Sequence, residues 1–304
     1  MKQLLPLIPR WQMLGLVAIL LVSFTLQFYH NTKKTHFHVD ENFSLDVIMN
    51  APDYFATSHK LDTWMTAKEF LTANRFIGKT DKKKLLEDFI QLRMNTGDSS
   101  HTNLYYLLLR LTIWTGVDNL EEYKWRGWAL NFVLFALGML FLMCLFNLLY
   151  PDKPWLVLLS TFLYAISVAS SAQVLFIRPY QLFGTALIML SFYIIQALQK
   201  SEPNQDDFIK IALASFFALS SYYYSIIFIG LFGFAIIGYS LRFGQPKRIG
   251  SFLLAAFAGY VIAEIFYPYY TYGIIFAPNK HISHLASPLS FTYFNRIGIF
   301  IFCD

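Results

Sequence analysis

The sequence has few of the residues on which soluble or disulfide-stabilised proteins depend. Its two cysteines are Cys144, inside an apolar run, and Cys303, beside the last residue, so no disulfide framework is indicated. Charged residues make up 14% of the chain, whereas a soluble domain carries about 25%. No C-x-x-C, H-E-x-x-H or phosphate-loop pattern occurs, and no internal repeat is visible. The composition therefore excludes an ordinary soluble domain.

The sequence also lacks a basic stripe interleaved with aromatic residues outside its apolar runs. The net charge of +5 comes mostly from short segments between those runs. Nucleic-acid binding needs a clustered electrostatic footprint. We therefore expect no nucleic-acid partner.

Long apolar runs dominate what is present. Hydrophobic residues make up 56% of the chain, with 31 Phe and 19 Tyr, and a bilayer-spanning helix needs about 20 consecutive apolar residues. A longer stretch, Phe208–Phe243, is interrupted at Ser220–Ser225, which predicts two shorter spans. Backbone groups in lipid must pair internally, which favours helices. We predict an all-α membrane protein, a polytopic helical bundle. The other runs are about Gln12–Tyr29, Trp128–Tyr150, Trp155–Ile177, Tyr180–Leu198 and Ile249–Tyr267.

The N-terminal 29 residues have a basic start and an apolar core, as a secretory signal peptide does. The residues before His30 contain no small-x-small cleavage pattern, so we favour an uncleaved anchor. The predicted organisation is a first transmembrane helix at 1–29, an extracytoplasmic loop at 30–124 and a multispan domain at 125–304.

The basic residues predict the orientation, because cytoplasmic loops carry an excess of Lys and Arg. With the N-terminus in the cytoplasm, the basic segments fall inside and the segment 30–124 falls outside the plasma (inner) membrane. The apolar residues Ile297–Phe302 resemble the start of another span, so we expect an incomplete member of its class. The inside residues are Lys2, Arg10, Lys153, Lys200, Lys210, Arg242, Lys247 and Arg248.

The long first loop contains two segments with a helical apolar face. Leu61, Trp64, Met65 and Leu71 share one face, and Leu85, Leu86, Phe89 and Ile90 share another. Between them, residues 79–84 read as a solvated basic turn. Such helices suit either the membrane surface or a small bundle that packs its apolar faces internally.

Two polar motifs lie in this loop. The pair Asp40-Glu41 follows the first apolar run by about ten residues, which places two carboxylates near the membrane surface. Residues 98–102 offer N-cap side chains for an amphipathic helix that starts at His101. Its predicted apolar stripe consists of Leu104, Leu107, Leu108 and Leu111.

Four segments together resemble the GT-C glycosyltransferases, in particular the protein O-mannosyltransferases and aminoarabinose transferases. Asp40-Glu41 looks like the acidic pair of that superfamily's first outer loop, and the Leu-Tyr-Tyr-Leu segment after His101 resembles its His-Pro-Pro-Leu-Tyr-Tyr segment. Residues 125–130 resemble the Arg-led start of the second span, and residues 176–182 resemble an Arg-x-Tyr-x-Leu stretch. This chain has Thr102-Asn103 where the family often has Pro-Pro. The resemblance covers residues 1–200.

The resemblance implies a GT-C fold and inverting transfer of a sugar from a polyprenyl-phosphate donor to a protein, lipid or glycan acceptor. It assigns the general base to Asp40 and acceptor orientation to Glu41, and it gives His101 a place in the substrate site. A carboxylate suits the proton transfer. The leaving lipid phosphate calls for cations, and Arg178 and Arg126, at the ends of predicted spans, are the candidates.

Three further features carry weaker hypotheses. Glu264 is the acidic residue inside an apolar run, where a functional role is the default; it could also pair with a neighbouring helix. Tyr223, in the cluster 222–224, would stack on sugar or isoprenoid, or belong to the interfacial aromatic belt. His281 and His284, with His101, could bind a divalent metal ion, although no cofactor is firmly indicated.

A non-catalytic transporter or flippase-like protein of envelope glycan assembly is the alternative. A transporter needs polar groups near the bilayer midplane on broken helices. The candidate residues here belong to the outer rim instead, which favours the enzyme. The residues do not distinguish one sugar from another.

Overall fold

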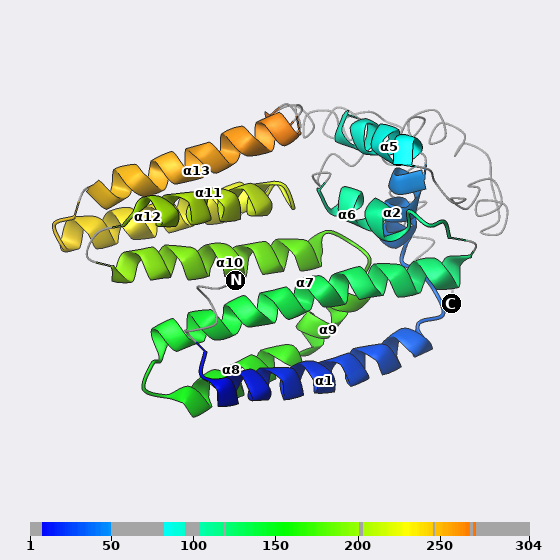
Figure 1. Ribbon diagram of the computed structural model, residues 1–304, viewed down its shortest axis with the longest axis horizontal. Helices are drawn as coiled ribbons and strands as arrows, with labels where there is room; N and C mark the ends of the chain where they lie inside the picture. Colours follow the sequence, from blue (N-terminus) through cyan, green and yellow to red (C-terminus); the bar gives the residue numbers. More distant parts are fainter. Residues whose placement is uncertain are drawn as a thin grey trace, which may run out of the picture.

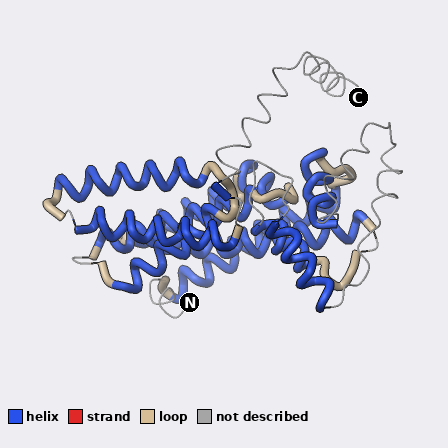
Figure 2. Tube along the Cα trace, turned by 90° about the horizontal axis from the view of Figure 1, so that it is seen from above, coloured by secondary structure: helices blue, strands red, loops and turns tan. Residues whose placement is uncertain are grey.

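The computed structural model of the chain describes residues 8–49, 82–94, 104–117, 119–200, 203–245, 247–267 and 270–271. This described part consists of helices joined by short connections, without a strand (Figure 2). The helices are α1 (Arg10–Lys33), α2 (Val39–Met49), α5 (Lys82–Met94), α6 (Leu104–Thr112), α7 (Leu120–Leu149), α8 (Pro154–Ala165), α9 (Val168–Leu175), α10 (Tyr180–Gln199), α11 (Gln205–Leu219), α12 (Ser225–Arg242) and α13 (Lys247–Phe266).

The long helices lie roughly side by side, and α2, α5 and α6 gather at one end of them (Figure 1). Within the described residues, α1, α7, α10, α12 and α13 are long and apolar enough to cross a membrane, and the bent pair α8–α9 would add a sixth span. The prediction of a helical membrane protein is confirmed. Many of their large apolar side chains face outward, as lipid contact requires.

Four packed clusters occur among the described residues, and three of them hold most of these helices together. One joins α1, α7, α8, α9 and α10 around Phe135, Met139 and Phe192. A second joins α10 to α11, α12 and α13. A third fills the space among α2, α5, α6 and the start of α7. Helix α10 therefore connects the two halves of the bundle, packing on α7 on one side and on α11 on the other (Figure 1).

Successive long helices run in alternate directions, so the chain turns at two ends of the bundle. We call one the α2 end, because α2, α5 and α6 cover it; α1, α9, α11 and α13 finish there. We call the other the basic end. It carries the connections 150–153, 200–204 and 243–247. Contacts tie its turns together: Asn147 Nδ2 donates to Gln12 Oε1 at 3.0 Å, and Gln199 Nε2 donates to the Leu148 carbonyl at 2.9 Å.

The predicted spans match the helices with instructive exceptions. The predicted break at Ser220–Ser225 is confirmed, because α11 ends at Leu219 and α12 begins at Ser225. The run Trp155–Ile177 is not one straight helix; it divides into α8 and α9 with a bend of 52°. Helix α7 begins at Leu120, so the predicted boundary between the extracytoplasmic loop (30–124) and the multispan domain (125–304) lies inside this helix.

Local sequence signals explain where these helices start. The Asn119 side chain accepts from the Glu122 N–H at the start of α7, and Ser167 does the same for Ser170 at α9. Asn204 and Asp207 form a reciprocal capping box on α11. Pro154 occupies the first turn of α8, where a missing N–H costs nothing. These caps fix the connections at both ends of the bundle.

The described part of the first loop packs as a small bundle on α7. Arg110 of α6 is 1% exposed, and its Nε donates to Asp88 Oδ2 of α5 at 3.1 Å. Leu92 of α5 is fully buried, whereas Leu86 and Ile90 are exposed. Helix α5 therefore packs internally through Asp88 and Leu92, whereas Leu86 and Ile90 of its predicted apolar face do not, and both interpretations of that face stay predictions. The first predicted face, at 61–71, lies outside the described residues.

Two local predictions in this loop are wrong. Residues 82–84, the second half of the basic turn predicted at 79–84, are the first residues of helix α5. In α6 the buried face includes Tyr105, Tyr106 and Leu109, while Leu111 of the predicted stripe is 47% exposed. The tyrosines are buried because α6 is covered by α2 on one side and α7 on the other.

Candidate functional site

The acidic pair occupies the first turn of α2, at the α2 end of the bundle. Asp40 and Glu41 are the second and third residues of the helix. Glu41 Oε2 accepts from the backbone N–H of His38 at 3.0 Å, so its carboxylate caps the turn from which α2 starts. A carboxylate near a helix N-terminus is also stabilised by the helix dipole.

Glu41 is a buried connector. Its side chain is 1% exposed, and Oε1 accepts from Lys34 Nζ and from the Ile177 N–H at 2.9 Å. Its backbone carbonyl accepts from the Tyr123 hydroxyl. One carboxylate thus joins the segment after α1, the start of α2 and the α9–α10 connection. Charge-assisted hydrogen bonds of this kind are among the stronger ones in proteins.

Lys34 completes this ion pair and was not singled out in the sequence. Its Nζ also donates to the Leu175 carbonyl at 2.7 Å, at the end of α9. Burial lowers the pKa of Lys34 below its ordinary value, and the Glu41 carboxylate offsets this only in part. The lysine therefore depends on Glu41 to keep its charge in a poorly solvated position.

Asp40 lies in a different environment from its neighbour. Its side chain is 44% exposed, and its backbone N–H donates to His38 Nδ1 at 3.2 Å. The carboxylate Oδ2 stands 3.5 Å from the same imidazole nitrogen. Asp40 therefore presents an accessible carboxylate beside an exposed imidazole, held in place by the turn that Glu41 caps.

Arg178, in the connection between α9 and α10, contacts the same helix that carries the acidic pair. It directly follows Ile177, the residue that donates to Glu41. Its Nη1 donates to the Tyr106 hydroxyl at 3.0 Å and to Ser44 Oγ at 3.3 Å, and the residue is 5% exposed. Arg178 lies two residues before α10, so its predicted position at the end of a span is confirmed. Its guanidinium is buried between α2 and α6 and is not exposed at the surface.

Asn131 of α7 holds the α9–α10 connection in place. Its Nδ2 donates to the carbonyls of Val174 and Phe176 at 3.1 and 2.8 Å, and its Oδ1 accepts from the Tyr105 hydroxyl at 3.0 Å. Burial raises the pKa of Tyr105, which keeps its phenol protonated as the donor. The sequence gives little signal for this residue, since an isolated Asn in an apolar run has many possible partners.

A glycine lets the same connection approach α7 closely. A Cβ atom on Gly127 would lie 2.7 Å from Ile177 Cδ1, much closer than real Cβ contacts allow. The small residue therefore lets Ile177 reach the depth at which its N–H meets Glu41. This residue adjoins Arg126 in the segment that resembles the start of the family's second span.

Aromatic rings form a continuous row from the acidic pair toward the α11–α12 turn. The rings of His38 and Phe176 are 5.3 Å apart, Phe176 stacks on Tyr180 at 5.8 Å, and Tyr180 meets Tyr222 at 6.1 Å. Phe176, Tyr180 and Tyr222 are half-buried, so part of each ring is accessible. We call His38, Phe176, Tyr180 and Tyr222 the aromatic row.

Tyr223, the predicted stacking residue, does not belong to this row. Its ring lies 5.3 Å from that of Tyr270, after the end of α13. Its neighbour Tyr222 belongs to the row, and the predicted stacking role of Tyr223 stays a prediction. Adjacent residues in a turn point in different directions, and the repeated Tyr222–Tyr224 sequence does not indicate which one faces α10.

Arg126 and Glu264 make local contacts away from the acidic pair. Arg126 Nη1 donates to Thr115 Oγ1 at 2.6 Å and to the Thr112 carbonyl at 3.1 Å, and Nη2 pairs with Glu122. Glu264 Oε2 accepts from the Thr271 hydroxyl at 2.7 Å and its N–H at 3.1 Å. Both side chains secure chain segments that follow or precede a long helix.

The predicted histidine sites lie outside the described residues. This applies to His101, three residues before α6, and to His281 and His284. Within the described ranges, no group of three His, Cys, Asp or Glu side chains is placed to hold a metal ion.

No protein-family model, curated protein or solved structure matches this chain in the comparisons.

Proposed function

We propose that the chain is a GT-C-type membrane glycosyltransferase that moves a sugar from a polyprenyl-phosphate donor to an acceptor hydroxyl at the α2 end. The observation that carries the proposal is the contrast within the acidic pair: Glu41 is buried and structural, whereas Asp40 is accessible beside the aromatic row. The resemblance in residues 1–200 supports the same assignment.

In this mechanism Asp40 acts as the general base. Its carboxylate takes the proton of the acceptor hydroxyl while that oxygen attacks the anomeric carbon. The bond between the anomeric carbon and the phosphate oxygen breaks, the electron pair leaves with the lipid phosphate, and the anomeric configuration inverts. Proton transfer by a positioned side chain contributes about 10²- to 10⁴-fold to such a rate.

Glu41 and Arg178 act on this reaction through position. Glu41 fixes the turn that carries Asp40, in place of the acceptor contact suggested by the sequence. Arg178 holds α2 against α6 and brings positive charge beneath the site, in place of a direct bidentate clamp on phosphate. Lys34, 16% exposed, adds a second cation, paired with Glu41.

The aromatic row offers a surface for the donor. Its accessible ring faces suit the apolar face of a sugar or the first isoprene units of the lipid, and binding sites are commonly lined by such side chains. The row connects the acidic pair to the side of the bundle, from which a lipid donor would arrive. We assign the α2 end to the extracytoplasmic face, because the basic end fits the cytoplasmic side.

A transfer assay tests this function. Membranes containing the protein should move labelled sugar from a polyprenyl-phosphate donor, tested as a panel of sugars, to endogenous acceptor. A nucleotide-sugar of the same hexose should not replace the donor in membranes depleted of polyprenyl phosphate. Transfer that depends only on the nucleotide-sugar would contradict the proposal.

One observation favours the alternative, a transporter. The bend between α8 and α9 lies beside the middle of α1, where Ser23 Oγ donates to the Ala165 carbonyl at 3.3 Å. One and two turns further along α1, Gln27 and Asn31 are fully buried, and their amide atoms have no hydrogen-bond partner among the described residues. Buried polar groups beside a broken helix are typical of transporter sites.

Substitution of these amides separates the two candidates. If the protein is an enzyme, Gln27→Leu and Asn31→Leu should leave sugar transfer within about two-fold of wild type and should stabilise the fold, because an unsatisfied buried polar group is removed. The transporter would be favoured if proteoliposomes with the wild type move a labelled polyprenyl-phosphate sugar across the bilayer and these variants lose that movement at wild-type thermal stability.

A further inference from the structure

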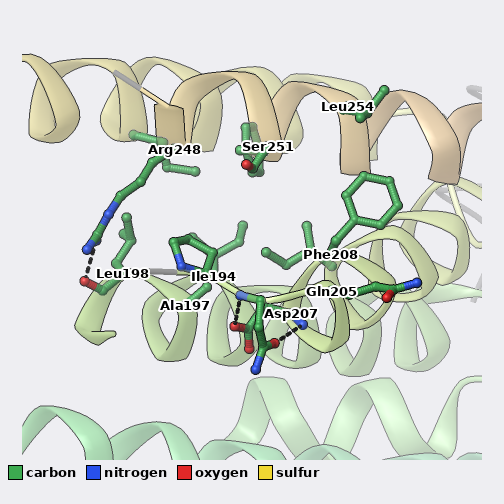
Figure 3. Close-up of a pocket in the computed structure, with 14 residues that line it drawn as sticks. Ile194, Ala197, Leu198, Gln205, Asp207, Phe208, Arg248, Ser251 and Leu254 are labelled. Atoms are coloured by element: carbon green, nitrogen blue, oxygen red, sulfur yellow. Dashed lines mark hydrogen bonds between the residues drawn. The ribbon is translucent and has the colours of Figure 1, made fainter. Parts of the chain in front are cut away.

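A cavity opens at the basic end, on the opposite side of the bundle from the acidic pair. It has a volume of about 250 Å³ and lies among the ends of α10, α11, α12 and α13 (Figure 3). Ile194 and Ala197 of α10 line one side and Ser251 and Leu254 of α13 line another (Figure 3). Its position excludes a part in the chemistry at Asp40.

The cavity walls are mostly apolar and come from all four helices. Phe208 and Ile211 of α11, Ile236 of α12 and Phe252 of α13 complete them. The polar groups on the α11 side are already satisfied by one another. Asp207 is 2% exposed, exchanges hydrogen bonds with Asn204 and pairs with Lys200. The interior therefore suits a hydrocarbon chain better than a polar metabolite.

Cations lie at the turn beside this cavity: Arg248 lines it, and Arg242 and Lys247 end α12 and begin α13. Arg248 is 7% exposed, and its guanidinium donates to the Leu198 carbonyl at 2.6 Å (Figure 3). It also donates to the Lys200 carbonyl, so the arginine caps the C-terminal end of α10. Arg242 and Lys247 flank the α12–α13 turn and are exposed. Among the described residues beside the cavity, the acids are Asp206 and the paired Asp207. The charge balance beside the cavity is positive.

We propose that this cavity binds an anionic membrane phospholipid, with one acyl chain between α10 and α13 and the phosphate at Arg242 and Lys247. An apolar slot open to the side of a helical bundle, with cations at its headgroup end, is the arrangement that recognises such lipids. The positive charge beside the cavity favours an anionic headgroup over a zwitterionic one. Insertion of an acyl chain into the cavity would distinguish this lipid from lipids that are only attracted to the charged surface.

Purified full-length protein in detergent tests the site with two defined lipids. Dioleoyl phosphatidylglycerol and dioleoyl phosphatidylcholine are added in equal mole fraction, and bound lipid is counted by native mass spectrometry while thermal unfolding is followed. Phosphatidylglycerol should be retained and should raise Tm, and phosphatidylcholine should do neither. Equal retention of the two lipids would overturn the proposal.

Matched variants separate the acyl-chain slot from surface charge. Ser251 is exposed, so Ser251→Trp should fill the slot without a folding defect and abolish retention, whereas Leu253→Trp, two residues along the same helix, should leave it unchanged. Lys247→Glu should weaken phosphatidylglycerol binding at least about five-fold, and Lys153→Glu, on the α7–α8 connection, should not. Retention unaffected by Ser251→Trp would overturn the seated lipid even if Lys247→Glu reduces binding.

Discussion

Asp40 and Glu41 are adjacent in sequence yet differ in environment because they lie on a helix. Successive side chains of an α-helix point about 100° apart. When Glu41 points into the protein toward Lys34 and the Ile177 N–H, Asp40 is directed toward the surface. The geometry of one helical turn thus buries one carboxylate in a structural contact and leaves the other accessible for the proposed chemistry.

This division predicts that Glu41→Gln is mainly a stability defect. The substitution removes the anion that Lys34 pairs with and weakens the bond from Ile177. Hydrogen bonds to charged groups contribute about 1.5–3 kcal/mol each, so the unfolding free energy should fall by at least that amount. Thermal unfolding in detergent measures it.

Glu87 on α5 is the control for that experiment. Its side chain is 61% exposed and, in the part of the chain that the structure describes, pairs with Lys83 on the same helix. Glu87→Gln should change stability by less than about 0.5 kcal/mol, because exposed pairs of this kind contribute little. If the two variants unfold at the same temperature, the connecting role of Glu41 is wrong.

At the scale of elements, the contact between α11 and α13 depends on a close backbone approach. A Cβ on Gly259 would lie 2.6 Å from the Ala212 carbonyl oxygen and 2.7 Å from Ser215 Cβ. A carbonyl oxygen of the main chain cannot turn aside as a flexible side chain can. Small residues at such crossings let membrane helices pack closely.

Gly259→Ala should therefore destabilise the protein by about 1–3 kcal/mol, the usual cost of overpacking. Gly250→Ala, two and a half turns earlier on α13, meets nothing within 4 Å and should stabilise slightly, by up to about 1 kcal/mol. Thermal unfolding of both variants tests the packing, and equal effects would contradict it.

The elements differ in how far they could be predicted. Helices α1, α7, α10, α12 and α13 follow from runs of apolar residues, and the break at Ser220–Ser225 from its polar composition. The bend at Ile166 and Ser167 was missed because apolar residues continue on both sides. The face of α6 was misread because a stripe of leucines does not show that tyrosines bond to α7 and to Arg178.

The candidate site could be predicted only where its residues belong to a local sequence motif. Asp40, Glu41 and Arg178 carry recognisable motifs, and the fold places them around one helix. Lys34 and Asn131 have no local signal, and the cluster 222–224 does not indicate that Tyr222 is the ring that faces α10. Their roles depend on contacts between segments far apart in the chain, such as the 136 positions that separate Glu41 from Ile177.

At the scale of the whole molecule, the two ends of the bundle differ in charge. Basic residues are in excess on the connections at the basic end, whereas at the α2 end cations are paired with acids, as in Lys34–Glu41 and Arg110–Asp88. Excess Lys and Arg favours the cytoplasmic side. On this basis we propose that the acidic pair and the cavity at the basic end lie on opposite faces of the membrane.

Single cysteines introduced in a Cys303→Ser background test this orientation, because the other native cysteine, Cys144, is buried. In intact cells a membrane-impermeant maleimide should label Lys33→Cys at the α2 end. It should label Lys153→Cys only after the cells are permeabilised. The reverse pattern would place the acidic pair in the cytoplasm and would contradict transfer at the outer face.

The most direct test of the account is the transfer rate of purified Asp40→Asn protein in proteoliposomes that contain a polyprenyl-phosphate sugar. The amide cannot accept the proton of the acceptor hydroxyl, and Asp40 is exposed and not part of the buried network. We predict a rate at least about 100-fold below wild type, with Tm unchanged. A rate within a few-fold of wild type would contradict the assignment of Asp40 as the base.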